Sequence, residues 1–176
     1  TFGAFFFDYN LDGLPDIFAL NGHVADDISV VQPSLSYAEP PLLFRNVGHG
    51  KFEEVSDKLG RALRDPLVGR GAACADIDND GDLDLVLTNV NGPARLLRND
   101  GANQNDMLRI KLIGTRSNRD AIGARVRLTT STGQYMNAMV KSGSSYLSQS
   151  ELPLTFGLGK PDPARRISIE IQWPGG

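Results

Sequence analysis

Short apolar runs separated by polar turns recur along the whole chain, which is the pattern of an all-β protein. Two pairs of runs stand out in the first half. Residues 4–7 and 17–20 flank one acidic stretch, and residues 72–75 and 85–88 flank a second. Each acidic stretch is entered and left directly from an apolar run, so we expect a strand-loop-strand corner at both places.

A third strand is expected after each pair, around residues 42–46 and 95–99. In the first copy, a turn leads to a fourth strand at 51–55, and residues 56–60 fit one helical turn that ends at a glycine. Four antiparallel strands in a repeat predict the blade of a β-propeller. Two blades cannot close a ring and repeats need neighbours, so we expect the chain to be part of a larger protein.

The two copies differ in one connection. Residues 23–41 of the first copy form a longer link between the second and third strands, and this link contains Asp26, Asp27 and several prolines. Its composition predicts a surface loop. Long loops on a repeated scaffold often carry binding function, and a neutral decoration is the alternative.

The pattern changes from about residue 106 onward. Apolar and basic or polar residues alternate along 108–113, 124–129 and 167–173, and a turn at 131–133 leads into a further strand at 134–141. Alternation of this kind predicts half-buried strands of a second, antiparallel β segment. A solvated sheet face explains its basic residues best, and a ligand-binding face is the alternative. We therefore divide the chain into residues 1–104 and residues 105–176.

The two acidic stretches carry the candidate chemistry. In both, oxygen-bearing side chains occupy loop positions 1, 3, 5 and 9, and glycine occupies position 6. Carboxylates this close repel one another unless a cation lies between them, and Ca²⁺ is the usual cation for all-oxygen ligands. We expect two calcium sites. The candidate ligands, including position 7 through its backbone carbonyl, are Asp8, Asn10, Asp12, Leu14 and Asp16, and Asp76, Asp78, Asp80, Asp82 and Asp84.

An EF-hand and a metal-free turn are the two alternative interpretations of these loops. An EF-hand requires a bidentate Glu at position 12, where this chain has Ala19 and Leu87, and it requires flanking helices. A metal-free turn is common for Asp, Asn and Gly, but two copies with one spacing favour metal. Because Asn10 replaces a carboxylate at position 3, we expect the first site to be the weaker one.

Composition and charge narrow the function classes. The net charge is −3, with the acid concentrated in the two loops, so no basic groove for nucleic acid is expected. No apolar run approaches the length of a membrane span. The single cysteine, Cys74, lies in an apolar run and reads as a small buried residue. Calcium loops favour a compartment where Ca²⁺ is abundant: extracellular, cell-surface or periplasmic.

Together, these motifs make the chain resemble two known families. Residues 1 to about 105 resemble FG-GAP/VCBS repeats, the calcium-bearing blades of integrin-α-like propellers, through Gly3-Ala4 and Gly69-Arg70-Gly71-Ala72 before the acidic loops. The remainder resembles the ASPIC/UnbV domain through the stretches 114–124, 142–150, 156–159 and 173–176. The pairing of the two is that of cartilage-acidic-protein-like proteins.

The resemblance implies a secreted or cell-surface protein that binds calcium through these aspartates and has no established catalysis. The leading hypothesis is an extracellular binding, adhesion or scaffolding module with structural calcium. Its partner would be another protein or a surface glycan, held on loops such as 23–41. Self-assembly through open sheet edges is also expected to be possible.

Two further functions remain open at this point. One is an enzyme or accessory subunit that uses Ser145, a histidine (His23 or His49), or a polar site of Asp120 with Arg116 and Arg119, although a turn held by ion pairs explains the last group equally well. The other is carbohydrate binding through exposed aromatic rings. The candidates for that role are Tyr37, Tyr135, Tyr146 and Trp173.

Overall fold

The computed structural model describes residues 1–102 and 104–175 and is built from four antiparallel sheets. The first sheet has the order β1-β2-β3-β4 and forms the first blade. Its strands are β1 (Gly3–Phe7), β2 (Asp16–Leu20), β3 (Leu42–Asn46) and β4 (Phe52–Glu54). The short helices η1 (Ser56–Lys58) and η2 (Arg61–Leu63) follow it. The blade therefore has the four expected strands and the expected helical turn.

The second blade contains three described strands in the order β5-β6-β7. They are β5 (Gly69–Ala75), β6 (Asp84–Asn89) and β7 (Arg95–Leu97). The two blades bury one common core, in which Phe5, Phe18 and Leu20 of the first pack with Leu85 and Leu87 of the second. Alternation explains the packing, since Phe5 and Phe7 of β1 point into this core while Phe6 stays exposed.

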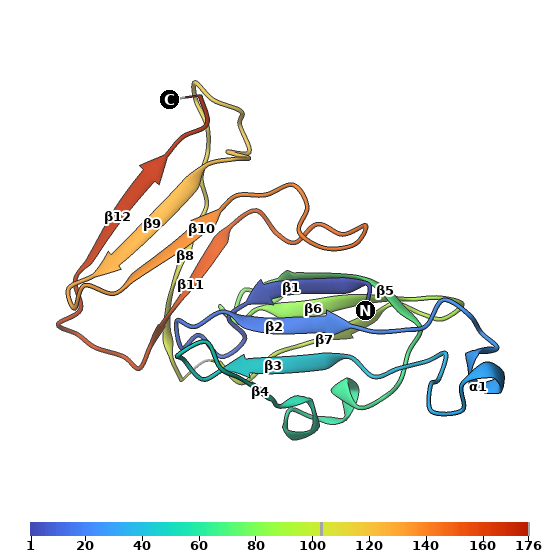
Figure 1. The fold of residues 1–176 in the computed structure, drawn as a ribbon. Coiled ribbons are helices and arrows are strands. Elements are labelled where there is room, and N and C mark those ends of the chain that lie inside the picture. The colour runs from blue at the N-terminus through green and yellow to red at the C-terminus, as the bar shows by residue number, and fades with distance from the viewer. Residues whose placement is uncertain (103, 176) are drawn as a thin grey trace.

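The C-terminal part is a second β unit that stands at a steep angle to the blades (Figure 1). It pairs β8 (Asp106–Ile110) with β11 (Leu154–Gly159). Its other sheet has the order β10-β9-β12, from β9 (Arg125–Thr130), β10 (Tyr135–Met139) and β12 (Ile167–Gln172). Val126, Leu128 and Phe156 form the centre of its core.

Two features of this unit differ from the sequence-based expectation. Strand β11 had not been predicted, because its Gly157 and Gly159 weaken the strand signal. Ile169 and Ile171 of β12 alternate as predicted but remain 43% and 40% exposed. They lie opposite Leu128 and Val126 in register, on the edge strand of the sheet. The basic residues of β9 are exposed, as a solvated face requires.

The long connection 23–41 lies at the opposite end of the first blade from the acidic loop, because it follows β2 whereas the acidic loop precedes it (Figure 1). Its only regular element among the described residues is the single turn α1 (Ile28–Val31), which buries none of its side chains. The predicted surface loop is thus confirmed, with one helical turn added.

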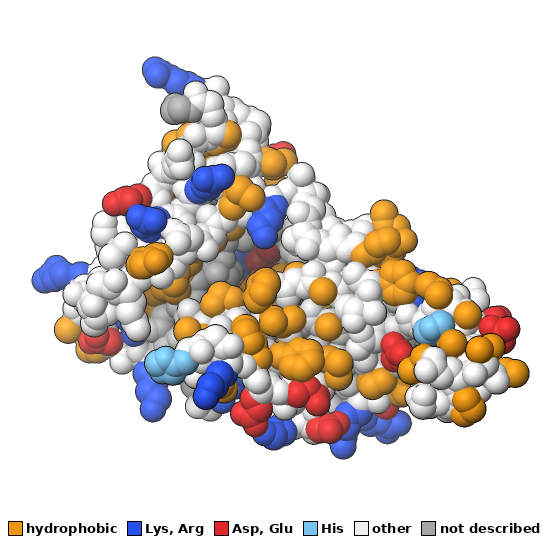
Figure 2. Space-filling view, in the orientation of Figure 1, with side chains coloured by type: hydrophobic (Ala, Val, Ile, Leu, Met, Phe, Trp, Pro, Cys, Tyr) orange, Lys and Arg blue, Asp and Glu red, His pale blue; other side chains and the backbone are white. Residues whose placement is uncertain are grey.

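A cleft of about 490 Å³ separates the blades from the C-terminal unit. Phe6 and Ile17 from the first blade line one side, and Met136 and Met139 from β10 line the other. Figure 2 shows hydrophobic side chains gathered in this hollow and again at the end of the blade that carries residues 23–41.

Strand β11 crosses so close to the first acidic loop that only glycine fits at position 157. A Cβ added to Gly157 would lie 2.5 Å from the carbonyl carbon of Leu11. The contact is reinforced by the amide of Gly159, which donates to the carbonyl oxygen of Leu11 at 2.9 Å. The acidic loop and the C-terminal unit are therefore packed backbone against backbone.

We predict that Gly157→Ala lowers the free energy of unfolding by about 1–3 kcal/mol, because backbone atoms cannot move aside as a side chain can. Gly143→Ala is the matched control, since its Cβ would meet its nearest neighbour at an ordinary 3.8 Å. Urea unfolding of both variants tests this. Equal stabilities would show that β11 does not press on the loop.

Candidate metal centre

The two acidic loops adopt the same backbone conformation at the same end of neighbouring blades. Positions 4 and 6 have positive φ in both: 57° and 87° at Leu11 and Gly13, and 62° and 101° at Asn79 and Gly81. Glycine at position 6 meets this requirement at low cost. The repeated sequence spacing thus corresponds to a repeated loop structure.

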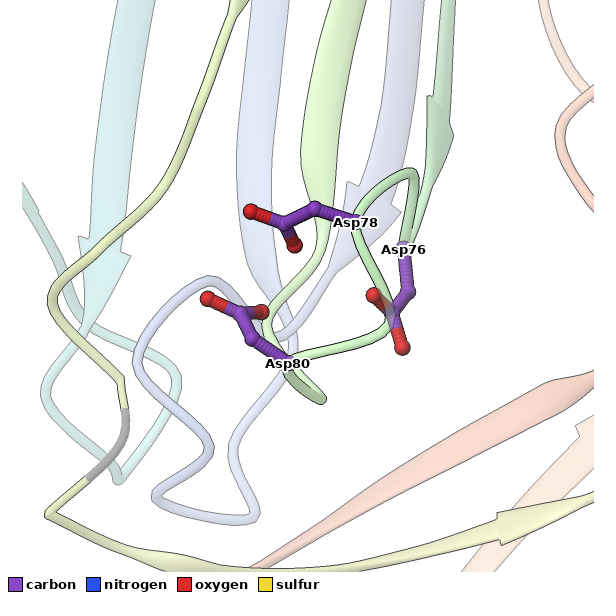
Figure 3. Close-up of side chains that lie close together, drawn as sticks. All are labelled: Asp76, Asp78 and Asp80. Atoms are coloured by element: carbon purple, nitrogen blue, oxygen red, sulfur yellow. The ribbon is translucent and has the colours of Figure 1, made fainter.

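The second loop brings three carboxylates together. Asp76, Asp78 and Asp80 each offer one oxygen, and these oxygens lie within 4.8 Å of one another (Figure 3). Asp76 is buried, and its Oδ1 has no hydrogen-bond partner among the described residues. A buried carboxylate oxygen without a donor is costly. An all-carboxylate donor set with an unpaired buried oxygen fits a hard divalent cation such as Ca²⁺.

Position 9 has a different role from positions 1, 3 and 5. Both oxygens of Asp84 accept backbone amides: Ile77 N within the loop at 3.0 Å and Asn99 N after β7 at 2.8 Å. Asp16 does the same for Tyr9 N at 3.2 Å and for Asn46 N at the end of β3 at 2.7 Å. These buried aspartates tie each loop to the end of its third strand. Metal ligation by their remaining lone pairs stays a prediction.

Neither residue at position 7, Leu14 or Asp82, contributes a side chain to the described cluster of carboxylate oxygens. Leu14 is apolar, and only its amide takes part, by donating to Asp12 Oδ1 at 3.0 Å. Asp82 is buried and accepts the amide of Ala102 at 2.9 Å through Oδ2. Burial raises the pKa of Asp82 above its usual range, with neighbouring aspartates adding to the effect. A ligand role for their backbone carbonyls stays a prediction.

The first loop is held by hydrogen bonds of its own. Asp8 accepts the amides of Asp12 at 3.1 Å and Gly13 at 2.8 Å, and the amide nitrogen of Asn10 donates to Asp12 at 2.9 Å. The Arg45 guanidinium lies 3.6 Å from Asp12. The neutral residue at position 3 thus supplies a donor where the second loop has an acceptor. This adds a reason for the predicted weaker first site, which stays a prediction.

Burial governs the protonation of the first loop. It raises the pKa of Asp8 to about 7, although the Gly13 amide opposes the shift, and the charges of Asp12 and Asp16 raise the pKa further. Burial likewise raises the pKa of Asp16 to about 6, against the opposing effect of the Asn46 amide. These carboxylates are therefore costly to ionise together without a cation nearby.

Sequence reasoning missed two residues of this region, Arg109 and Glu151. The Arg109 side chain from β8 bonds both Asp76 Oδ2 and Glu151 Oε2. Its place in an alternating apolar and basic run predicted a solvated sheet face, and that expectation is wrong for Arg109, which is only 24% exposed. No local sequence signal identifies Arg109, because its partner Asp76 lies in the second blade, whereas Arg109 lies in the C-terminal unit.

Of the candidate serine and histidine residues, Ser145 and His23 accept backbone amides, whereas His49 is exposed. Ser145 Oγ accepts the amide of Ala4 at 3.0 Å, and Ser150 Oγ accepts the amide of Cys74 at 3.1 Å. His23 Nδ1 accepts the amide of Ala25 at 3.0 Å. Burial raises the pKa of the Cys74 thiol, as expected for an unreactive residue. The stretch 142–150 therefore attaches the C-terminal unit to β1 and β5.

The proposed polar site around Asp120 is an exposed turn. Asp120, Arg116 and Arg119 are all exposed, and no ion pair among the described residues involves them. Asn118 holds the turn instead, by accepting the amide of Ile122 at 2.7 Å and donating to its carbonyl at 2.9 Å. The expectation of an ion-paired turn is wrong, because the amide side chain of Asn118 offers both a donor and an acceptor to the backbone of one residue.

The aromatic candidates divide into packed and exposed rings. Trp173 packs against the small core around Ala121, Ala124 and Val140. Tyr135 is 64% exposed, with Arg127 5.4 Å from its ring centroid. Tyr146 stacks edge-on against Phe2 with ring centroids 5.5 Å apart. Tyr37 is half-buried.

None of the helices within the described part of the chain is long and apolar enough to cross a membrane.

Comparison with known proteins finds a family match for each of the two parts of the chain. Residues 8–87 match the FG-GAP-like repeat family, and residues 114–176 match the ASPIC and UnbV family. The chain is 33% identical over 139 residues to cartilage acidic protein 1 of Homo sapiens and of Mus musculus, an alignment that covers 76% of this chain. The chain spans about a fifth of the length of these relatives, 20% and 21%. The protein of that name from Xenopus tropicalis is 33% identical over 111 residues, which is 61% of this chain and 16% of the relative.

We predict that Asp84→Asn lowers the free energy of unfolding by about 1–3 kcal/mol, because an amide nitrogen would then face a buried backbone N–H. The loss should be equally large in excess chelator, since the bonds to Ile77 and Asn99 need no metal. Asp100→Asn, at an exposed carboxylate, is the control. Urea unfolding in excess chelator measures this loss. A loss seen only in calcium-containing buffer would contradict the view that Asp84 stabilises the blade through its two backbone hydrogen bonds.

Proposed function

The chain joins FG-GAP-like repeats to an ASPIC and UnbV segment, and on this premise we propose that it is an extracellular, calcium-binding module for adhesion or scaffolding. It would bind a protein or a surface glycan, and the calcium would be structural. The likeness to cartilage acidic protein 1 supports an extracellular place for it.

One observation carries the calcium part of the proposal: the Asp76, Asp78 and Asp80 cluster with its buried, unpaired Asp76 Oδ1. These three side chains would hold the ion, together with a backbone carbonyl at Asp82. When bound, Ca²⁺ supplies a divalent charge that neutralises the loop. Since the folded loop alone gathers these oxygens, binding should stabilise the fold in proportion to the logarithm of the free calcium concentration.

The location of the loops indicates what calcium would stabilise. Both loops lie where the blades meet the C-terminal unit, with Met107 beside Gly81 and Gly157 beside Leu11. Neutralising them would fix the two loops at the junction with the C-terminal unit. Calcium would therefore act at this junction as well as on the corners of the two blades.

Residues 23–41 are the proposed partner-binding surface, at the far end of the first blade. Val24, Val30 and Val31 are 73%, 82% and 77% exposed there, beside the acidic pair Asp26 and Asp27. Exposed apolar side chains rimmed by charge are typical of interaction sites. Self-assembly through the edge strand β12, with its exposed isoleucines, is the alternative mode of association.

Catalysis is not part of this proposal. Ser145 and His23 accept backbone amides, and Asp120, Arg116 and Arg119 are exposed. We expect Ser145→Ala to change the stability of the module and no chemical activity. An activity of the intact chain that Ser145→Ala or His23→Ala abolished in a folded protein would replace the binding proposal.

We predict that excess chelator lowers the thermal unfolding midpoint of the wild-type chain by several degrees, as loss of about 1–3 kcal/mol of ligand stabilisation would require. Asp80→Ala should lose most of this response, because it removes one of the clustered oxygens. Asp100→Ala, which removes an equal charge outside the cluster, should keep it. A midpoint that does not depend on calcium in the wild type would remove the basis of the proposed function.

A further inference from the structure

Asp76 has two oxygens in two different environments. Its Oδ2 is bonded to the Arg109 guanidinium, whereas its Oδ1 is buried with no partner and belongs to the loop that gathers Asp78 and Asp80. A cation held by the loop and the cation of Arg109 would therefore share one carboxylate. The loop belongs to the second blade, and Arg109 belongs to β8 of the C-terminal unit.

We propose that Arg109 sets the calcium affinity of the second loop through Asp76, so that calcium binding and the attachment of β8 to that loop oppose one another. This inference rests on the proposed calcium site. It gives Arg109, a residue of the C-terminal unit, an influence on a metal site whose ligands all come from the second blade.

The sign of the effect follows from charge. A fixed positive group that shares a ligand with a divalent ion repels that ion, and the repulsion is weakly screened where the carboxylate is buried. Asp76 is buried, and Arg109 is only 24% exposed. Arg109 also bonds Glu151, so its loss would leave a second uncompensated carboxylate near the loop. Both consequences favour calcium binding when Arg109 is neutralised.

The other arginines near the acidic loops do not have this arrangement. Arg98 lies 3.8 Å from Asp78 and Arg45 lies 3.6 Å from Asp12, with side chains 62% and 46% exposed. Water and salt screen such pairs strongly. Arg109 is therefore the described arginine whose charge acts on the cluster through a buried ligand.

Linkage requires the effect to be reciprocal. If Arg109 weakens calcium binding by a given factor, bound calcium weakens the Arg109–Asp76 interaction by the same factor. Calcium would then tighten the loop of the second blade and loosen the hold of that blade on β8. Strand β11 would be unaffected in its contact with the first loop, which is made by backbone groups.

The test is a calcium titration by calorimetry of the full chain, in an Asp12→Ala background that disables the first loop. Arg109→Gln should bind calcium about tenfold more tightly, and Arg109→Lys, which keeps the charge, should stay within about threefold of its parent. Arg165→Gln is the matched control, because it removes an equal charge. Arg165 pairs with Asp106, which lies on β8 as Arg109 does. Urea unfolding of each variant verifies that it is folded.

Amide hydrogen exchange supplies a second readout. Adding calcium to the parent chain should increase protection at residues 76–84 and decrease it along β8, whereas Arg109→Gln should show only the increase. Unchanged affinity in Arg109→Gln, or an equal rise in Arg165→Gln, would overturn this inference while leaving the calcium site intact. If no variant binds calcium, the proposed function fails as well.

Discussion

Each blade depends on a buried aspartate at the end of its acidic loop that satisfies two backbone amides at once. Asp16 and Asp84 each accept one amide of their own loop and one amide at or just after the end of the third strand. Such a carboxylate fixes the corner of the blade whether or not an ion is present. The remaining acidic residues are then free to be arranged for a ligand, which is why one motif can combine structural and binding roles.

The junction between the blades and the C-terminal unit is polar where it meets the second loop and tightly packed where it meets the first. Arg109 enters the second loop as a charged side chain, whereas β11 meets the first loop through glycine and backbone hydrogen bonds. The two acidic loops therefore differ in the contacts that the C-terminal unit makes with them: a charged side chain at the second loop and backbone groups at the first.

Much of this structure could be predicted from the sequence, because local spacing determines much of it. The alternation of apolar residues located the strands of both blades, and the Asp spacing located the loop whose carboxylates cluster. Arg109 and Glu151 could not be predicted, since their role arises from contact between segments distant in sequence. Strand β11 was missed because its glycines, which suggest a turn, are needed for close approach to Leu11.

The stretch 142–151 also affects how the chain can be divided. Its serines bond the free amides of Ala4 and Cys74 on the outer edges of β1 and β5, and Glu151 donates its amide to the carbonyl of Cys74. The segments on either side of the boundary that the sequence suggests near residue 104 are therefore held together by direct hydrogen bonds. Blades produced without the C-terminal segment would expose unpaired strand edges and an uncompensated buried carboxylate at Asp76. The smallest unit that can be produced and studied faithfully is one that keeps both parts together.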